Sequence, residues 1–320
     1  MTVRNETAGD PGRPALIAID WGTSALRGWL LSQDGAVLER RASRQGIMAV
    51  ADNDFDAAYR TFTADWRAVR AGLPALAAGM IGSRQGWAEA PYVACPAGFA
   101  DLTDRCVTVG AHDASLKIVP GLSWQSPDRG IDVMRGEETQ LFGALAESGH
   151  DGLFILPGTH SKWAWVEAGR IVAFVTYMTG ELFAVLRGHS ILGRMMPADG
   201  AMVHDAAAFA DGARDGLSGG HELLHRLFGV RTRGLFGTLV PDAAPSFLSG
   251  LLIGAEVVAA QATGKIGHGA SAAVLIGEAT LCQRYADVLA MTGIATRRAD
   301  ADVTPRGLWR LARTAGMIAA

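Results

Sequence analysis

The chain has 320 residues, of which 49% are hydrophobic, and its formal net charge at pH 7 is −3. This length and apolar content suffice for two core-bearing domains of about 150 residues each. The mildly acidic balance and the lack of a basic block exclude the electrostatic footprint of a protein that binds nucleic acid or an anionic membrane. The three cysteines are far apart and odd in number, which suits a reducing compartment and predicts a cytoplasmic protein.

The first 45 residues begin with a polar tail and continue as a strand meander. Residues 1–14 lack the apolar core of a signal peptide, so we expect a disordered tail. Ala15–Asp20 predicts a buried strand, Trp21–Ser24 a turn, and Leu26–Leu31 a strand that returns antiparallel. Asp34-Gly35 predicts a hairpin turn before a third strand.

The rest of the first half alternates helices with short strands. In chain order the apolar spacing predicts a helix over Asp54–Ala71, a strand over Leu73–Ile81 that leads into a functional loop at Gly82–Gly86, a strand over Leu116–Leu122 and a helix over Thr139–Glu147. Gly149–Gly152 is the best candidate for a domain boundary because glycines and charged residues cluster there.

The second half repeats the opening pattern. Leu153–Pro157 predicts a strand, Gly158–Ser161 a turn, and Trp163–Val166 a returning strand, with a third strand after Gly169. Further helices are predicted over Phe183–Leu192, Glu222–Phe228, Phe247–Thr263, Thr280–Leu289 and Pro305–Ile318, and a strand over Ala272–Ile276. The segment Phe247–Thr263 is interrupted by Glu256 and is short for a membrane span, so we interpret it as a buried helix.

The two turns are the main functional signal. The sequence contains neither a Walker phosphate loop nor a dinucleotide Gly-x-Gly-x-x-Gly. Gly22-Thr23-Ser24 and Gly158-Thr159-His160-Ser161 can instead aim backbone N–H groups and hydroxyls at the phosphates of ATP, and Lys162 can add a charge. Asp20 is the candidate Mg²⁺ ligand, through water. One such turn alone is usually a plain hairpin, but the repetition indicates an ATP-using phosphotransferase.

Several motifs also resemble a known family. Ile19-Asp20-Trp21-Gly22-Thr23-Ser24, with Arg27, resembles the first phosphate motif of the actin-like ATPase superfamily, to which hexokinases belong. More narrowly, the chain resembles the 2-dehydro-3-deoxygalactonokinase family of sugar-acid catabolism. The matching stretches are Ala78–Ser83, Val133–Gln140, Leu156–Trp163, Met178–Leu182 and Phe247–Glu256.

This resemblance implies an α/β architecture with two domains of the actin-like, ribonuclease H-like fold, each a mixed sheet flanked by helices, and a cleft between them. It implies transfer of phosphate from ATP to the 6-hydroxyl of 2-dehydro-3-deoxy-D-galactonate, with Gly277 near the adenosine and Arg27 near the phosphates. We expect residues 15–150 to bind the sugar acid and residues 151–320 to bind the nucleotide, with the option that the C-terminal helix packs back on the first domain.

A sugar kinase also needs a base and, for this substrate, a partner for the carboxylate. Glu137 and Glu138 open a predicted helix, where the helix dipole favours the anion, and we favour Glu137 as the base. The alternative is that both glutamates simply cap the helix. Arg135 and Arg84 are candidates to bind the substrate carboxylate, and Ser83 to bind a hydroxyl.

The sequence also leaves room for different functions. His221-Glu222-Leu223-Leu224-His225 matches the H-E-x-x-H pattern of zinc proteases, although five residues match readily by chance. The chain is also compatible with a kinase for a related acid such as 2-keto-3-deoxygluconate, or with a non-catalytic sugar sensor on the same fold. The sequence does not determine the oligomeric state, and a homodimer is one option.

Overall fold

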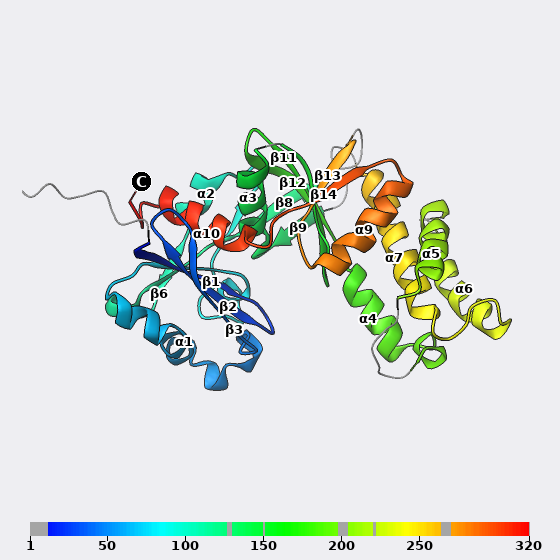
Figure 1. The fold of residues 1–320 in the computed structure, drawn as a ribbon, viewed down its shortest axis with the longest axis horizontal. Helices are drawn as coiled ribbons and strands as arrows, with labels where there is room; N and C mark the ends of the chain where they lie inside the picture. The colour runs from blue at the N-terminus through cyan, green and yellow to red at the C-terminus, as the bar shows by residue number, and fades with distance from the viewer. Residues whose placement is uncertain are drawn as a thin grey trace, which may run out of the picture. The chain divides into compact units, whose positions relative to one another are not determined.

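The computed structural model describes residues 12–126, 130–149, 151–197, 204–219, 222–263 and 270–319. Its contacts divide the chain into two compact units, shown as a ribbon in Figure 1. Unit 1 comprises Met1–His150, Gly169–Ile171 and Asp300–Ala320, and unit 2 comprises Asp151–Ala168 and Val172–Ala299. The C-terminal segment therefore belongs to unit 1. Most of the predicted tail lies outside the described residues, and the first strand begins at Pro14.

Unit 1 is built on a six-stranded mixed sheet with the order β3-β2-β1-β4-β7-β6. Its strands are β1 (Pro14–Trp21), β2 (Leu26–Ser32), β3 (Val37–Ser43), β4 (Ala75–Ala78), β6 (Val107–Val109) and β7 (Leu116–Ile118). Strand β1 is antiparallel to β2 and parallel to β4, so the chain leaves β1 through a tight turn and reaches β4 by a crossover.

A second sheet of unit 1 was not predicted. It contains β5 (Tyr92–Ala94), β8 (Gly121–Ser126) and β9 (Gly130–Met134), in the order β5-β8-β9. The single strand predicted over Leu116–Leu122 was wrong, because it is two strands in different sheets. Pro120 separates them and cannot donate a ladder hydrogen bond, which suits a change of sheet at that point.

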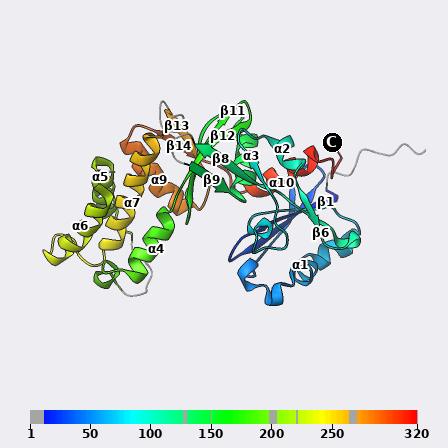
Figure 2. The same ribbon diagram turned by 180° about the vertical axis from the view of Figure 1, so that it is seen from behind.

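Two layers of helices cover the large sheet of unit 1. The helices are α1 (Phe55–Val69), α2 (Phe99–Thr103), α3 (Glu137–Ser148) and α10 (Val303–Thr314), with 3-10 turns at Ile47–Ala49, Ala51–Asn53, Met80–Gly82 and His112–Ala114. Figures 1 and 2 show α1 and α10 on opposite faces of the sheet. Helix α10 also packs on α3, which fixes the start of α3 relative to the sheet.

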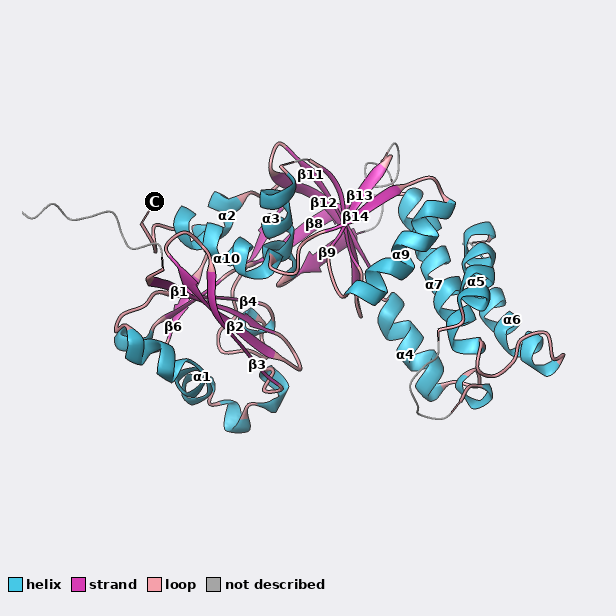
Figure 3. Ribbon diagram, in the orientation of Figure 1, coloured by secondary structure: helices cyan, strands magenta, loops and turns pink. Residues whose placement is uncertain are grey.

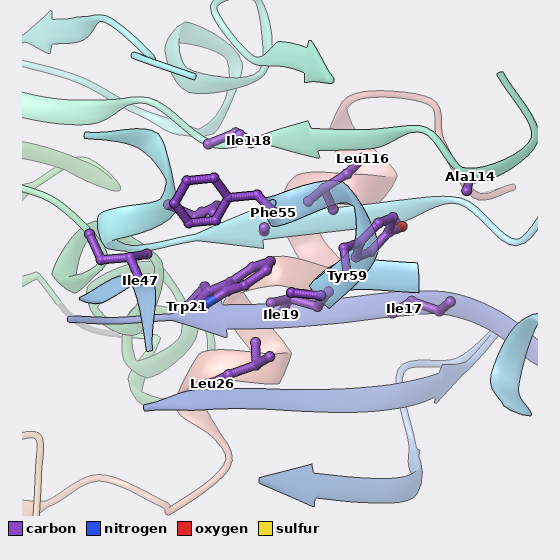
Figure 4. Packing of buried hydrophobic residues seen from close by; sticks show 14 of the residues in the cluster. Ile17, Ile19, Trp21, Leu26, Ile47, Phe55, Tyr59, Ala114, Leu116 and Ile118 are labelled. Carbon is purple, nitrogen blue, oxygen red and sulfur yellow. The ribbon is translucent and has the colours of Figure 1, made fainter. Parts of the chain in front are cut away.

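Alternation along β1 decides which side chains meet α1. Ile17, Ile19 and Trp21 point into the core that α1 completes with Phe55 and Tyr59, as Figure 4 shows. The rings of Trp21 and Phe55 meet edge to face, with centroids 5.9 Å apart. Because successive side chains of a strand alternate, Asp20 points to the opposite face of the sheet, which leaves its carboxylate out of this apolar core.

Unit 2 repeats the strand order of unit 1. Its five-stranded sheet has the order β12-β11-β10-β13-β14, and β10 is antiparallel to β11 and parallel to β13. The strands are β10 (Gly152–Leu156), β11 (Ser161–Glu167), β12 (Arg170–Tyr177), β13 (Ala272–Leu275) and β14 (Ala295–Arg298). The repeated strand-turn-strand pattern of the sequence is thus confirmed, and β14 was not predicted.

The helices of unit 2 gather mainly beside that sheet (Figure 3). They are α4 (Thr179–His189), α5 (Ala206–Ser218), α6 (Leu223–Leu235), α7 (Ala244–Gln261) and α9 (Ala279–Met291), with a 3-10 turn at Gly193–Met195. Helix α5 was not predicted. Its backbone packs directly against that of α7, since a Cβ on Gly212 would lie only 2.0 Å from the Phe247 carbonyl oxygen.

Helix α7 resembles a membrane span in length and composition only. In the described part of the chain it is the one helix that passes this test, and 83% of its most apolar window is buried inside the protein. The prediction that it is a buried core helix is confirmed, since it contacts α4, α5, α6 and α9.

Candidate active site

The first predicted phosphate turn joins β1 to β2. The Gly22 N–H donates to the Ala25 carbonyl at 2.9 Å, and the carbonyls of Gly22 and Thr23 accept from Ile47 and Met48 at 3.0 and 3.3 Å. Their carbonyls are therefore turned to the protein, while the side chains of Thr23 and Ser24 are exposed. The turn is therefore held by backbone hydrogen bonds, and the hydroxyls of Thr23 and Ser24 face solvent.

Asp20 is the penultimate residue of β1, the strand that enters this turn, and it is paired with Arg27 on the neighbouring strand. The two residues are cross-strand partners, and the Arg27 guanidinium lies 2.6 Å from Asp20 Oδ2. Burial raises the pKa of the Asp20 carboxyl, and Arg27 opposes this shift by favouring the charged form. The Arg27 side chain is 54% exposed, so an anion in solvent can still contact it.

Helix α3 begins next to Asp20. A Cβ on Gly79 would lie 3.1 Å from Asp20 Oδ1, and a Cβ on Gly136 would lie 3.2 Å from the Gly79 α-carbon. Both glycines have positive φ, 96° and 106°, which strongly favours glycine here. The Glu137 carboxylate accepts from the Arg135 N–H at 3.0 Å and raises the pKa of Asp20 by its charge. The loop before α3 thus brings two predicted acids into one cluster.

Glu138 differs from its neighbour because it is fully buried. Its Oε2 accepts from the Gly136 N–H at 2.6 Å, while Oε1 has no hydrogen-bond partner among the described residues. Burial, reinforced by the charge of Glu137, raises its pKa to about 8. The Glu138 carboxyl is therefore mostly protonated near neutral pH, whereas Glu137 beside it is half-buried.

Arg135 lies beside Gly82, the residue before Ser83. Its Nη2 donates to the Ala90 carbonyl at 2.8 Å, and its guanidinium lies 4.4 Å from the centroid of the Tyr92 ring. Nη1 is adjacent to Gly82, where a Cβ would approach it to 2.9 Å. Within the described parts of the chain, Ser83 Oγ and the Nε and Nη1 atoms of Arg135 are buried without a hydrogen-bond partner. These donors are unused by the protein itself.

The structure does not bring Arg84 to this group. Its side chain is 86% exposed, and its Nε lies 3.0 Å from the carboxylate of Glu89, five residues on. A surface ion pair of this kind contributes little to stability or to a built site.

The second predicted phosphate turn joins β10 to β11 in unit 2. Thr159 and His160 are exposed at its tip, and Gly158 is half-buried. The start of α4 packs directly against it, because the Glu181 N–H donates to the Thr159 carbonyl at 3.0 Å and a Cβ on Gly180 would lie 2.4 Å from the Gly158 carbonyl oxygen. His160 Nε2 lies 2.5 Å from the Glu181 carboxylate.

Ser161, the last residue of the predicted turn, differs from the prediction. Ser161 was expected to contact phosphate, but its side chain is fully buried and its hydroxyl donates to Glu256 at 2.6 Å, so the direct-ligand role was wrong. Alternation along β11 explains this, because the first residue of the strand points to α7. Lys162 is 4% exposed, and its ammonium donates to the His160 carbonyl at 3.2 Å.

Gly277 follows β13 and is exposed beside the second turn. Its φ is 150°, and a Cβ at this position would lie 3.4 Å from the Pro157 carbonyl oxygen, so the backbone here is one that a ligand can approach closely. A cavity of about 70 Å³ lies between this turn, α4, α7 and α9, and Gly158, Phe183, Leu281 and Arg284 line it. Arg284 was not predicted, since one arginine in an amphipathic helix carries no distinguishing pattern.

The zinc-protease hypothesis gains nothing from the structure. His221 lies outside the described residues, and Glu222 forms a 3.4 Å ion pair with Arg226 one turn along α6. Among the residues that the structure describes, no group of three His, Cys, Asp or Glu side chains could hold a metal ion.

Comparison with known proteins decides the family. The family model described as 2-keto-3-deoxy-galactonokinase matches residues 20–311. The chain belongs to the 2-keto-3-deoxy-galactonokinase family. The match spans both units and contains all the site residues predicted above, and the protein is a kinase.

Individual relatives of the kinase agree over most of its length. A probable 2-dehydro-3-deoxygalactonokinase of Rhizobium meliloti (strain 1021) is 39% identical over 300 residues, which are 92% of this chain and 96% of the relative. The 2-dehydro-3-deoxygalactonokinase of Escherichia coli (strain K12) is 42% identical over 75% of this chain and 78% of its own. A crystal structure from Sinorhizobium meliloti, provisionally assigned the same activity, superposes with a TM-score of 0.86 at 36% identity and covers 93% of this chain and 98% of its own.

Proposed function

We propose that this kinase transfers the γ-phosphoryl group of ATP to the 6-hydroxyl of 2-dehydro-3-deoxy-D-galactonate, in the cytoplasm. The observation that supports this best is the cluster at the ends of β1 and β4 in unit 1, where Asp20, Glu137 and Arg135 converge on glycine-lined backbone. A kinase for a sugar acid needs these three functions: a phosphate-side acid, a proton acceptor and a cation for the substrate carboxylate.

Arg135 and Ser83 are proposed to hold the sugar acid. The guanidinium is anchored at one end by the Ala90 carbonyl and stacked on Tyr92, so its remaining N–H groups have a fixed direction. Such a fork matches a carboxylate bidentately. A buried donor without a partner costs free energy, about 1–3 kcal/mol, that binding of an acceptor recovers. The unused donors of Arg135 and Ser83 therefore favour an anionic, hydroxylated ligand.

Glu137 is proposed as the base. As the 6-hydroxyl oxygen attacks the γ-phosphorus, the bond from that phosphorus to the bridging oxygen of ADP breaks and the hydroxyl proton passes to the Glu137 carboxylate. Its position at the first turn of α3 stabilises the anion through the helix dipole. The Arg135 N–H donates to one oxygen of this carboxylate and orients it.

The nucleotide is proposed to bind unit 2 through Gly158, Thr159, His160 and Gly277, with Lys162 as a nearby charge. The exposed tip of the second turn supplies N–H and hydroxyl donors, and the open backbone at Gly277 suits the adenosine. In unit 1 the Gly22 N–H is already bonded to the Ala25 carbonyl, so the first turn offers the exposed hydroxyls of Thr23 and Ser24 to phosphate oxygens, and Arg27 offers a cation.

Magnesium is proposed to bind at Asp20 through water. The residues fit this ion, because a carboxylate oxygen at a strand end and the exposed hydroxyls of Thr23 and Ser24 are hard oxygen donors. The bound ion would neutralise charge on the transferred phosphate.

An ATP-dependent assay over a panel of substrates tests the proposal. The panel contains 2-dehydro-3-deoxygalactonate, its gluconate-derived epimer and the corresponding neutral sugar without the carboxylate. We expect the highest kcat/KM for the galactonate-derived acid and a loss of at least about tenfold for the neutral sugar, because the contact to Arg135 is then missing. Equal turnover of the acid and the neutral sugar would contradict the sugar-acid assignment.

A further inference from the structure

Glu256 is the one acid of α7, and it lies in the apolar interior of unit 2. It is 3% exposed and belongs to a helix whose other buried residues are apolar or small. A buried carboxylate is costly unless donors surround it. At the level of sequence it was interpreted as part of the core, and nothing in the local pattern assigns it a role.

Side chains from three other elements donate to this carboxylate. Oε1 accepts from the Ser161 hydroxyl at 2.6 Å and from the Trp163 indole N–H at 2.7 Å. Oε2 accepts from the Tyr285 hydroxyl at 2.6 Å, and the Thr179 hydroxyl also hydrogen-bonds to Glu256. Glu256 thus connects the start of β11, the start of α4 and the middle of α9, and all these donors are neutral.

Two of these donors flank the second phosphate turn. Ser161 is the residue directly after its tip, although it lies 95 residues from Glu256 in the sequence. Thr179 opens α4, and the next two residues pack on the turn: Gly180 against the Gly158 carbonyl and Glu181 through the Thr159 carbonyl. The carboxylate therefore ties together the two backbone segments that define the shape of the turn.

We propose that Glu256 is a positioning residue for ATP, which holds the second phosphate turn in its binding shape through Ser161 and Thr179. It does not touch the nucleotide. This inference rests on the proposed use of ATP, and it adds that nucleotide affinity depends on a buried acid outside the turn. Preorganised donors bind anions better because no ordering cost remains at the moment of binding.

Ser161→Ala and Thr179→Val test this without removing the carboxylate. Glu256→Gln is the conservative variant, which removes the charge and keeps hydrogen-bonding groups at the same position. ATP affinity is measured by calorimetry, together with KM for the sugar acid and the melting temperature. We expect Ser161→Ala and Thr179→Val each to weaken ATP binding by about five- to tenfold, the equivalent of one hydrogen bond, with the sugar-acid KM within about twofold of wild type. Glu256→Gln should stay close to wild type, because hydroxyl partners can reverse their hydrogen bonds toward an amide.

Ser246→Ala is the matched control. Ser246 is buried on the same helix and accepts a hydrogen bond from the Asp205 N–H at 3.0 Å, where α5 begins. We expect this change to lower the melting temperature and leave ATP affinity unchanged. The inference is overturned if the two turn-side variants behave like this control, or if they raise the KM values for ATP and sugar acid equally.

The same measurements separate the inference from the proposed function. A wild-type protein that binds ATP but phosphorylates none of the sugar acids contradicts the proposed function, while the ATP affinities of the variants still decide the role of Glu256. A wild-type protein that does not bind ATP contradicts both.

Discussion

The two Gly-Thr turns occupy equivalent places in two sheets with the same strand order, but different chemistry supports them. The first follows an acid, Asp20, which is paired with Arg27 across the hairpin. The second follows Leu156 and Pro157, and the acid behind it comes from a distant helix and accepts only neutral donors. One backbone pattern therefore carries two different electrostatic environments.

A glycine from another segment backs each turn. A Cβ on Gly46 would lie 2.3 Å from the Thr23 carbonyl oxygen, and one on Gly180 would lie 2.4 Å from that of Gly158. The shape of both turns thus depends on close backbone packing, whereas the acid at the first turn is paired with an arginine. We therefore expect that removal of a charged side chain at the first turn lowers turnover. We expect that disturbed packing behind the second turn lowers nucleotide affinity.

The largest expected effect is on the acids of α3. Glu137→Gln keeps the size of the side chain and its contact to the Arg135 N–H but cannot take a proton, so kcat should fall by about 10²–10⁴-fold with little change in KM. Steady-state kinetics with Glu138→Gln as the matched variant assigns the role. If neither substitution lowers kcat by about tenfold, both glutamates only cap the helix and the base lies elsewhere.

Asp20 is the next test of the charged turn. Asp20→Ala should reduce kcat by about a hundredfold or more, because metal positioning contributes several kcal/mol to the transition state. The fold should persist, since the Asp20 side chain points away from the apolar core that contains Trp21. Circular dichroism and an ATP-dependent assay check both parts, and turnover above about a third of wild type would remove Asp20 from the metal site.

The packing behind the second turn is tested by two glycines of one helix. Gly180→Ala should raise the KM for ATP by about tenfold, since the added methyl must displace the Gly158 carbonyl or the helix, at a cost of about 1–3 kcal/mol. Gly188 has nothing within 4 Å of the new Cβ, so Gly188→Ala should leave KM unchanged and stabilise α4 by about 0.5–1 kcal/mol. Equal kinetics for the two variants would show that the turn tolerates the methyl group.

The substrate carboxylate gives a smaller effect that is confined to unit 1. Arg135→Lys keeps the charge but loses the planar fork, so the sugar-acid KM should rise by about tenfold while the ATP KM stays constant. Arg84→Lys is the control, because Arg84 is exposed and paired with Glu89, and it should change neither KM. A larger effect at Arg84 would reverse the assignment of the two arginines.

The buried carboxyl of Glu138 gives an expected pH dependence of stability. Glu138 has a pKa of about 8 in the folded protein, against 4.5 for an unperturbed glutamate. Its contribution to stability is therefore complete below pH 4.5 and is lost as the pH rises through 8, since the unfolded state releases the proton first. Urea unfolding at several pH values should show wild-type stability falling by several kcal/mol relative to Glu138→Gln over this range, as one pKa unit equals about 1.4 kcal/mol. Parallel pH curves for both proteins would contradict the shifted pKa.

Local pattern alone determined the repeated architecture. The apolar runs around Asp20 and Leu156, each followed by a Gly-Thr turn and an alternating strand, specified β1, β2, β10 and β11, because strand and turn preferences act over a few residues. Helical spacing likewise located α1, α3, α7 and α9. Short or weakly patterned elements such as β9, β14 and α5 were not predicted, since their formation depends on contacts with distant parts of the chain.

The sequence by itself also concentrated the candidate site in a few motifs, with Asp20, Glu137 and Arg135 among them. Only the tertiary structure decided which candidates meet. In the structure the Arg84 side chain is exposed, whereas Ser83 Oγ and two guanidinium nitrogens of Arg135 are buried. Ser161 points to the interior and donates a hydrogen bond to Glu256. The physical reason is that the side chain of a residue fixes its chemistry, whereas its burial and its partners depend on the elements that pack against it. Those elements lie far away along the chain.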